Sequence, residues 1–346
     1  MDIVVVKKIQ FWILWLQKKD PNSLFYRGVL IELGSRLRSY SKKTIKNPLW
    51  LLMSIFARFL TFRHLVKLVA KFFSKEEVKI FDLNSSIFQD VNVDEVAESM
   101  KSNGLHLGIN LPKPAVQEIL DFCAKTNCYG DAEHQLGFIY TEKAQAEQKC
   151  GKTFNMAQYF NINSLCPIIN KLANDPVLLE IATQYLGTKP VHTGSRLWWI
   201  FPVDEASHNP NKTISFFHYD LDDYSCIRFF FYLTDVDSSS GPHVCVPGSH
   251  TNKKLAHVLS LMKRRSDREI VDYYGSENIL TFGGEAGFGF AEDTFCFHKA
   301  TPPKSKDRLM LQIQFAIKDY GNHNDLADPL SLQSIGDDNK RDHASV

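Results

Sequence analysis

The segment Arg308–Lys318 constrains the fold of this chain more than any other. Its apolar residues occupy one side of an alternating pattern: Leu309, Leu311, Ile313, Phe315 and Ile317. The other side holds Arg308, Met310, Gln312 and Gln314. A period of two predicts a β-strand with two different faces. Further strands are predicted by aromatic and β-branched residues at Val191–Phe201, Thr213–His218 and Ser225–Val236. Several strands without intervening helices predict a double-stranded β-helix (a jelly-roll or cupin-like barrel), mainly over residues 190–320.

Helical segments precede this barrel. Three are predicted, at Val93–Ser102, Pro112–Cys123 and Cys166–Leu186. The first ends at Gly104, where an extended piece begins. We therefore expect a mainly β, α+β domain over residues 81–325, with packing helices flanking the barrel, and a polar C-terminal tail over residues 326–346.

The N-terminal region differs from the rest in charge. Residues 1–75 carry 15 lysines and arginines and three acidic residues, whereas the whole chain has 40 basic and 39 acidic residues. A basic, helical extension is therefore expected over residues 1–80. Its predicted helices are Ile3–Lys19 and, after a linker rich in Ser and Lys at Ser35–Lys46, Pro48–Phe73. The basic residues of the second recur every four positions, at Arg63, Lys67, Lys71 and Lys75.

Two interpretations of this extension stay open. Neither helix has the roughly 20 uncharged apolar residues that a membrane span needs. An apolar helix with a basic stripe fits a peripheral position on an anionic membrane, and it fits equally well a helix pair packed on the body of the protein.

The seven cysteines are odd in number and lack close metal-type pairs. They indicate reduced thiols and therefore a cytoplasmic location. If the N-terminal helices bind lipid, we expect the protein at the inner face of a membrane.

The candidate catalytic residues are His218, Asp220 and His298, followed by Arg308. In an extended segment His218 and Asp220 project to the same side, and the barrel can bring His298 to the same ion. Two imidazoles and one carboxylate cap one face of an octahedral Fe(II) and leave the other face open, as in non-haem iron oxygenases. A guanidinium ten residues past His298 suits the distal carboxylate of 2-oxoglutarate through a bidentate pair.

The ordered set of these residues resembles the phytanoyl-CoA dioxygenase-like family of Fe(II)/2-oxoglutarate oxygenases. The resemblance is carried by Phe217–Asp220, by the Gly-Pro to Pro-Gly-Ser-His segment Gly241–His250, and by His298 through Arg308. Weaker similarities upstream extend it to roughly residues 90–320. It implies that His218, Asp220 and His298 bind the iron, that Arg308 binds 2-oxoglutarate, and that O₂ is the oxidant.

Some positions need separate comment. Members of the family often have a hydroxyl residue two positions after the distal His; here Ala300 stands there, and Thr301 is the candidate replacement in the co-substrate site. Halogenating relatives have a small residue where this chain has Asp220, so the carboxylate favours hydroxylation. Candidate substrate contacts are Arg196, Trp198 and His243. The short run Lys263–Arg265 is flanked by acids and predicts a solvated helix face, so no nucleic-acid partner is expected.

The sequence thus predicts a dioxygenase that hydroxylates an aliphatic C–H bond of a small-molecule or lipid-type substrate. Two alternatives remain. One is a cupin-like metalloenzyme that does not use 2-oxoglutarate, and Arg308 argues against it. The other is a catalytically idle, membrane-associated binding protein, and the intact set of three ligands argues against that.

Overall fold

The structure, a computed structural model, describes residues 40–73, 81–260 and 263–336. The predicted helix Ile3–Lys19, the first part of the linker and the end of the polar tail lie outside these ranges. The chain divides into two units, Met1–Met53 and Ser54–Val346. In the described part of the first unit, residues 40–46 are helical where a linker was predicted. The ring of Tyr40 packs there on Trp50, with centroids 5.1 Å apart.

The predicted helix Pro48–Phe73 is two helices, α3 (Pro48–Phe56) and α4 (Leu60–Phe73). The prediction of one helix was wrong because the break depends on a distant contact. In the turn between them, Arg58 donates to the carbonyl oxygens of Ser54 at 3.1 Å and Ser260 at 2.6 Å. Within the described ranges, no helix has the length and apolarity needed to cross a bilayer.

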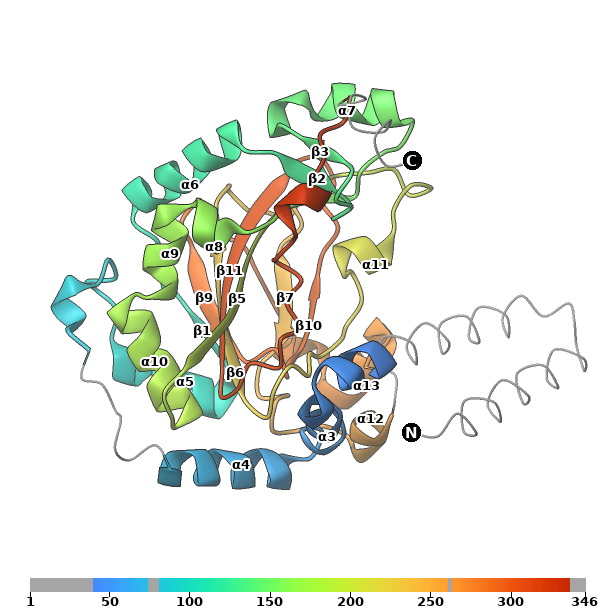
Figure 1. Cartoon of the computed structure of the whole chain (residues 1–346). Helices are drawn as coiled ribbons and strands as arrows, with labels where there is room; N and C mark the ends of the chain where they lie inside the picture. The colour runs from blue at the N-terminus through green and yellow to red at the C-terminus, as the bar shows by residue number, and fades with distance from the viewer. Residues whose placement is uncertain (1–39, 74–80, 261–262, 337–346) are drawn as a thin grey trace, which may run out of the picture. The chain divides into compact units, whose positions relative to one another are not determined.

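Two antiparallel sheets form the centre of the second unit (Figure 1). The larger has the order β1-β9-β6-β11-β5-β4-β2-β3. Its strands are β1 (Leu105–Leu107), β2 (Cys128–Gly130), β3 (Gly137–Phe138), β4 (Met156–Tyr159), β5 (Val191–Ile200), β6 (Cys226–Tyr232), β9 (Gly289–Glu292) and β11 (Arg308–Ala316). The smaller has the order β10-β7-β8, with β7 (His243–Val246), β8 (Leu280–Phe282) and β10 (Phe297–Ala300).

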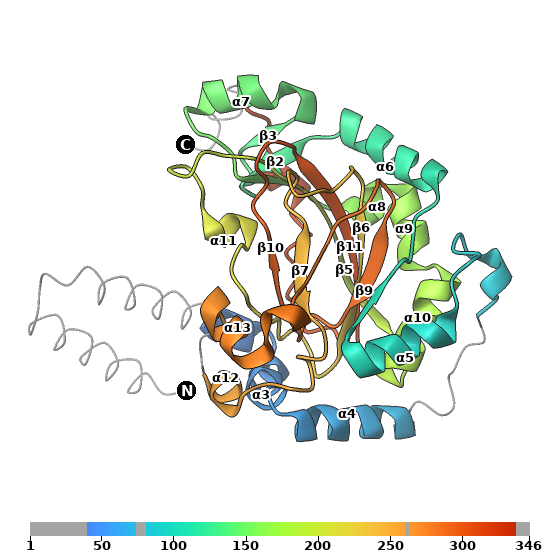
Figure 2. The same cartoon turned by 180° about the vertical axis from the view of Figure 1, so that it is seen from behind.

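Helices cover the outer face of the large sheet, and the small sheet lies against its inner face (Figures 1 and 2). The covering helices are α5 (Val93–Asn103), α6 (Lys113–Lys125), α8 (Ile162–Leu165), α9 (Pro167–Ala173) and α10 (Pro176–Leu186). Other helices lie elsewhere: α7 (Lys143–Cys150), α11 (Pro210–Thr213), α12 (Leu255–Leu259) and α13 (Asp267–Tyr274). Helix α5 ends at Asn103, so the break predicted at Gly104 is confirmed; this C-cap glycine has a left-handed φ of 66°.

The two faces of β11 enter two different cores. Leu309, Leu311, Ile313 and Phe315 join the large apolar cluster beneath the helices. Met310 joins a smaller cluster between the sheets, with Phe230, Tyr232 and Phe290. The predicted alternation is therefore confirmed, and so is the jelly-roll fold class.

Some element boundaries were wrong. The predicted strand Thr213–His218 begins in α11, passes through Ile214 with a φ of 54°, and pairs only through single bridges at Phe217 and His218. Cys166–Leu186 is divided into α9 and α10, because Asp175 caps α10 by accepting from Val177 N and Leu178 N. All seven cysteines are free thiols, as predicted.

Helix α4 is fixed to the barrel by a buried ion pair. Arg63 Nη2 lies 3.0 Å from Asp293 Oδ2, and both side chains are almost fully buried. Tyr185 of α10 donates its hydroxyl hydrogen to the same carboxylate at 2.6 Å. The guanidinium also stacks over the ring of Phe295 at 4.1 Å. The proposed domain boundary near residue 80 stays a prediction, but this part of the extension is in contact with the barrel.

We expect Arg63→Ala to lower the free energy of unfolding by about 3–5 kcal/mol, since removing one partner leaves the buried carboxylate of Asp293 without its cation. Urea denaturation followed by circular dichroism measures the change. The control is Arg268→Ala, which removes an exposed pair with Asp272 and should cost less than about 1 kcal/mol. Equal effects of the two substitutions would contradict a structural role for the Arg63 pair.

Candidate metal centre

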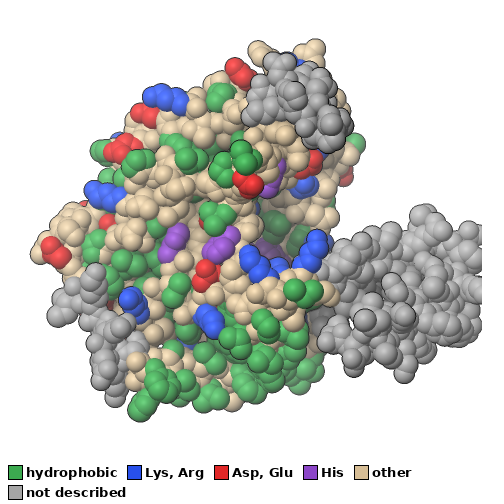
Figure 3. Space-filling view, in the orientation of Figure 1, with side chains coloured by type: hydrophobic (Ala, Val, Ile, Leu, Met, Phe, Trp, Pro, Cys, Tyr) green, Lys and Arg blue, Asp and Glu red, His purple; other side chains and the backbone are tan. Residues whose placement is uncertain are grey.

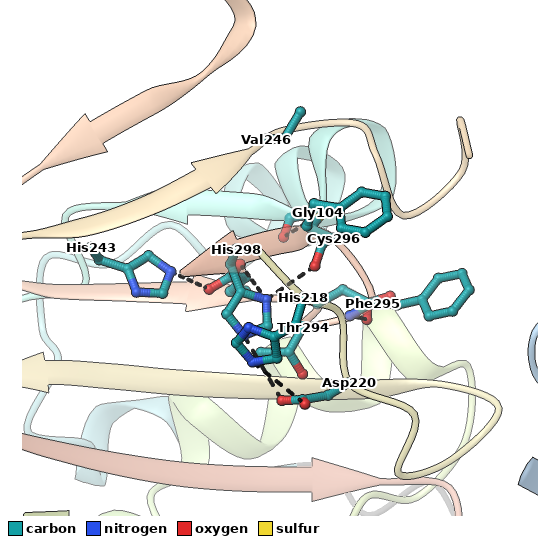
Figure 4. A network of polar contacts seen from close by, with 12 residues as sticks. Gly104, His218, Asp220, His243, Val246, Thr294, Phe295, Cys296 and His298 are labelled. Atoms are coloured by element: carbon teal, nitrogen blue, oxygen red, sulfur yellow. Dashed lines mark hydrogen bonds and ion pairs between the residues drawn. The ribbon is translucent and has the colours of Figure 1, made fainter. Parts of the chain in front are cut away.

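Two backbone hydrogen bonds bring His218 and His298 together. His218 N donates to His298 O at 3.0 Å, and His298 N donates to His218 O at 2.9 Å. Two residues further on, Asp220 N donates to Thr294 O at 2.7 Å. Because side chains two residues apart on an extended chain share a face, His218 and Asp220 both project toward the ring of His298 (Figure 4).

The three side chains converge on one point. His218 Nε2 lies 3.8 Å from Asp220 Oδ1, and His298 Nε2 lies 3.9 Å from Asp220 Oδ2. One donor atom of each residue lies within 4.8 Å of the other two. In the described ranges this is the one group of three His, Cys, Asp or Glu side chains close enough to share an ion. The predicted triad is therefore assembled by the fold.

The hydrogen bonds of the imidazoles determine which nitrogens face the ion. His218 Nδ1 lies 3.1 Å from Phe216 O, and His298 Nδ1 lies 3.0 Å from Cys296 O. A carbonyl oxygen only accepts, so each Nδ1 carries the ring proton and each Nε2 keeps its lone pair. This is the usual orientation of metal-binding histidines.

Arg228 holds the carboxylate of Asp220. Its Nη1 donates to Asp220 Oδ2 at 2.5 Å, its Nη2 donates to Asp222, and its Nε donates to Gln314 at 2.7 Å. Burial disfavours the ionised carboxylate, but Arg228, His218 and His298 outweigh burial and hold the pKa of Asp220 well below its usual value. Burial, followed by the neighbouring His298, lowers the pKa of His218 to about 3. At neutral pH His218 is therefore neutral and Asp220 ionised, the states that bind a metal.

Aromatic rings and two cations support these strands from behind. Tyr219, Phe295 and Phe297 alternate with the metal-binding face and are buried. The Lys253 ammonium lies 4.9, 4.5 and 4.2 Å from their ring centroids and donates to Ser249 O at 2.7 Å. Together with Arg63 it fixes the back of the site through cation–π contacts.

Arg308, at the start of β11, is buried with spare hydrogen-bonding capacity. Its Nη1 donates to Gly241 O, whereas its Nε has no partner among the described residues. Gly241 has a φ of 79°, and a Cβ there would meet the carbonyl oxygen of Thr301. The glycine therefore allows the Gly-Pro segment to pack closely against the backbone of residues 301–303. A buried N–H without a partner is costly, and a carboxylate from a ligand would satisfy it.

A fully buried carboxylate, Glu292, lies beside the triad. Glu292 Oε2 lies 2.9 Å from His243 Nε2, and Glu292 Oε1 lies 3.7 Å from His298 Nδ1. The ring of His243 stacks on that of His298 with centroids 5.7 Å apart. Figure 4 shows His243 beside His298, away from Asp220. His243 therefore lies next to the ligand set and is not one of its members.

The other predicted residues lie on different parts of the barrel. Arg196 is half-buried on β5, donates to Gln158 Oε1 at 2.8 and 3.3 Å, and stacks 5.0 Å from the ring of Trp198. Trp198 packs against the core between the sheets. Thr301 follows β10 and donates its backbone N–H to Pro242 O at 3.1 Å. Ala300, not Thr301, shares the face of His298 by alternation, so the role of Thr301 stays a prediction.

Sequence reasoning missed Arg228 and Glu292. Each is a lone charge in an otherwise apolar strand, Cys226–Tyr232 and Gly289–Glu292. A charge in such a strand needs a buried partner, and that signal was available. The run Lys263–Arg265 was also misjudged: it is not helical, Arg265 is buried, and Arg264 stacks 4.0 Å over the ring of Phe216.

The donor set fits ferrous iron. Two imidazoles and a carboxylate are the donors of the facial arrangement found in non-haem Fe(II) enzymes. The Nε of the buried Arg308, which has no hydrogen-bond partner among the described residues, fits the carboxylate of a 2-oxo acid. Both observations come from the geometry of the residues themselves.

The chain belongs to the phytanoyl-CoA dioxygenase (PhyH) family, whose model matches residues 105–310. The matched region contains His218, Asp220, His298 and Arg308. It is a family of oxidoreductases that depend on Fe(II), 2-oxoglutarate and O₂, and these are the cofactors of this chain. No curated protein is similar enough in sequence to count as a relative.

Solved structures are similar at low identity. The epimerase SnoN, in complex with Fe3+, alpha ketoglutarate and nogalamycin RO, is 14% identical with a TM-score of 0.44, over 64% of this chain and 82% of that one. HygX from Streptomyces hygroscopicus, with nickel and 2-oxoglutarate bound, is 14% identical with a TM-score of 0.44, over 65% and 87%. EctD from S. alaskensis with bound Fe is 14% identical with a TM-score of 0.43, over 67% and 81%.

We expect His298→Ala to abolish stoichiometric Fe(II) binding, because it removes one of the two imidazole donors. Arg228→Gln should weaken Fe(II) binding by about 10- to 100-fold, since it releases the carboxylate of Asp220. Anaerobic titration with Fe(II), followed by isothermal calorimetry, measures both.

The matched control is His192→Ala, a half-buried histidine on β5 that contacts Ser195 at 2.9 Å and no triad residue. It should bind Fe(II) like the wild type. Full Fe(II) affinity in His298→Ala would refute the assignment of the ligands.

Proposed function

We propose that this protein hydroxylates an aliphatic C–H bond of a small-molecule or lipid-type substrate. The observation that carries the proposal is the complete triad with the carboxylate of Asp220 in place. That carboxylate occupies the position that a small residue would leave open for a halide. The buried Arg308, with its unpartnered Nε, supports 2-oxoglutarate as the co-substrate.

The chain's own residues have separable tasks. When bound, iron and 2-oxoglutarate supply the oxidation, in which the 2-oxo acid loses CO₂ to become succinate and one oxygen atom of O₂ goes to the substrate. Arg308 pairs with the distal carboxylate, and Arg228 keeps Asp220 ionised and oriented. The aromatic residues Phe230, Phe290 and Trp198 line the region between the sheets and exclude water from it.

Arg196 is the residue we propose for substrate recognition. It is half-buried, and its hydrogen-bond partner among the described residues is the neutral amide of Gln158. Burial and then the neighbouring Arg228 lower the pKa of Arg196. A cation with this environment favours a substrate that presents an oxyanion or a strong hydrogen-bond acceptor. A screen of metabolites, scored by substrate-stimulated succinate release, identifies it.

We also propose that α4 contacts a membrane surface, as part of a peripheral, cytoplasmic location. Its outward face exposes Leu65, Leu68, Val69 and Phe72, each between 47% and 68% accessible. Figure 3 shows hydrophobic side chains gathered at the lower edge of the molecule, over α4. Contiguous exposed apolar side chains on one helix face are typical of an interaction site.

We expect Arg308→Gln to raise the Kd of 2-oxoglutarate by about 10- to 100-fold, because it removes a charge-assisted pair. Anaerobic titration of the Fe(II) protein with 2-oxoglutarate, read from the charge-transfer absorbance, measures it. Arg196→Gln should leave this Kd unchanged and reduce succinate release stimulated by substrate.

Three results would contradict the proposed function or one of its residue assignments. An unchanged Kd in Arg308→Gln would reject its assignment to the co-substrate. Turnover of a substrate without O₂-dependent succinate formation would favour a cupin-like metalloenzyme. Failure of the wild type to bind iron would favour an idle binding protein.

We expect the double substitution Leu68→Glu with Phe72→Glu to reduce co-sedimentation with anionic vesicles at least about tenfold, since each residue loses apolar burial in the lipid. The control is Leu330→Glu, an apolar residue far along the chain that is more exposed than either, at 89% accessible. Equal binding by both variants would remove the membrane contact of α4.

A further inference from the structure

A cavity of about 170 Å³ lies between α4 and the barrel. Helix α4 contributes Leu60, Arg63, His64 and Lys67, the end of α5 contributes Lys101, and the barrel side contributes Ser225 and Asp293. None of the three metal ligands lines it. It is therefore separate from the candidate metal centre.

The charge of this cavity is unbalanced. Its one carboxylate, Asp293, already accepts from Arg63 at 3.0 Å and from the Tyr185 hydroxyl at 2.6 Å. Lys67 has no carboxylate within ion-pair distance among the described residues; its ammonium lies 4.3 Å from the Tyr185 ring centroid. Among the described residues, the ion-pair partner of Lys101 is the exposed Glu98, at 2.7 Å. Two lysines therefore line a cavity whose carboxylate, Asp293, already has hydrogen-bond donors.

The state of Lys67 supports this description. Burial lowers its pKa to about 8, Asp293 opposes the shift, and Arg63 and Lys101 add to it. A ligand with negative charge would compensate the loss of solvent around this ammonium. The neighbouring cations that now repel Lys67 would then share the same anion.

Ser225 gives an independent sign of a ligand. Its side chain is 1% accessible, and its hydroxyl oxygen has no hydrogen-bond partner among the described residues. The residue lines the cavity. A buried hydroxyl without a partner costs about 1–3 kcal/mol, and an oxygen atom of a bound ligand would accept its hydrogen.

We propose that this cavity binds a phosphate-type oxyanion, held by Lys67, Lys101 and Arg63 together with the Ser225 hydroxyl. Phosphate oxygens accept from lysine, arginine and hydroxyl donors at once. The inference is independent of the oxygenase activity. The same chemistry is presented by free phosphate esters and by the headgroup of an anionic lipid.

The position of the cavity beside α4 is compatible with both a free phosphate ester and a lipid headgroup. The cavity-lining residues recur at positions 60, 63, 64 and 67, and the exposed apolar residues at 65, 68, 69 and 72. A shift of five residues is about 140° around a helix. The cavity therefore opens on the side of α4 that faces the barrel, while the apolar side chains face outward.

The test uses the full chain loaded with Fe(II). Isothermal titration with inorganic phosphate and with glycerol 3-phosphate measures the free ligands. Sedimentation with phosphatidylcholine vesicles, with and without phosphatidic acid, measures the lipid headgroup. The variants are Lys67→Met, Lys67→Arg and Ser225→Ala, and the control is Lys171→Met, an exposed lysine on α9.

We expect Lys67→Met to weaken binding of the phosphate ligand by at least about tenfold, Ser225→Ala by about fivefold, and Lys67→Arg to restore most of the affinity. Lys171→Met should bind like the wild type. An effect on the free ligands identifies a soluble phosphate, and an effect confined to vesicles with phosphatidic acid identifies a lipid headgroup.

Three outcomes would overturn the proposal. They are no binding of any probe at millimolar phosphate, binding that Lys67→Met leaves unchanged, and vesicle binding that does not depend on phosphatidic acid when neither free phosphate ligand binds. Fe(II) affinity and succinate formation, measured on the same samples, separate these outcomes from a failure of the oxygenase assignment.

Discussion

The metal centre depends on one antiparallel bridge, the pair of backbone hydrogen bonds between His218 and His298. Backbone groups make this contact, so the two rings are placed before any ion is present. The bond from Asp220 N to Thr294 O continues the same pairing by two residues, and alternation then directs all three donors to one face. A ligand set built on paired extended segments is more rigid than one built on free loops.

The segment that carries Thr294 and His298 is itself held by buried charges. Asp293 caps the turn by accepting from Phe295 N at 2.9 Å, and Arg63 of α4 neutralises it. Lys253 packs against the rings on the far side of the same turn. Helix α4 therefore contributes to the support of the metal centre although it lies far from it in sequence. A buried ion pair of this kind is valuable for geometry more than for net stability.

Much of the site followed from the sequence because its signals are local. The His-x-Asp spacing, the alternation of β11 and the glycine at position 104 each act within a few residues. The break between α3 and α4 depends on Arg58 reaching Ser260, and the loss of the predicted strand before His218 depends on the left-handed Ile214. The pairing of Arg228 with Asp220 also needs the folded chain. Patterns of hydropathy contain none of these contacts.

The roles of three buried arginines are decided by their partners. Arg228 faces two carboxylates, Asp220 and Asp222. Its charge is therefore neutralised within the protein, and its role is to orient the carboxylate of Asp220. Arg308 bonds to a backbone carbonyl and keeps Nε unpartnered within the described ranges, whereas Arg196 bonds to a neutral amide. Of these three, Arg308 and Arg196 therefore keep a positive charge that no carboxylate of the described residues neutralises and that a ligand can use. The proposed co-substrate and substrate sites therefore use separate guanidinium groups, and neither competes for the cation that holds Asp220.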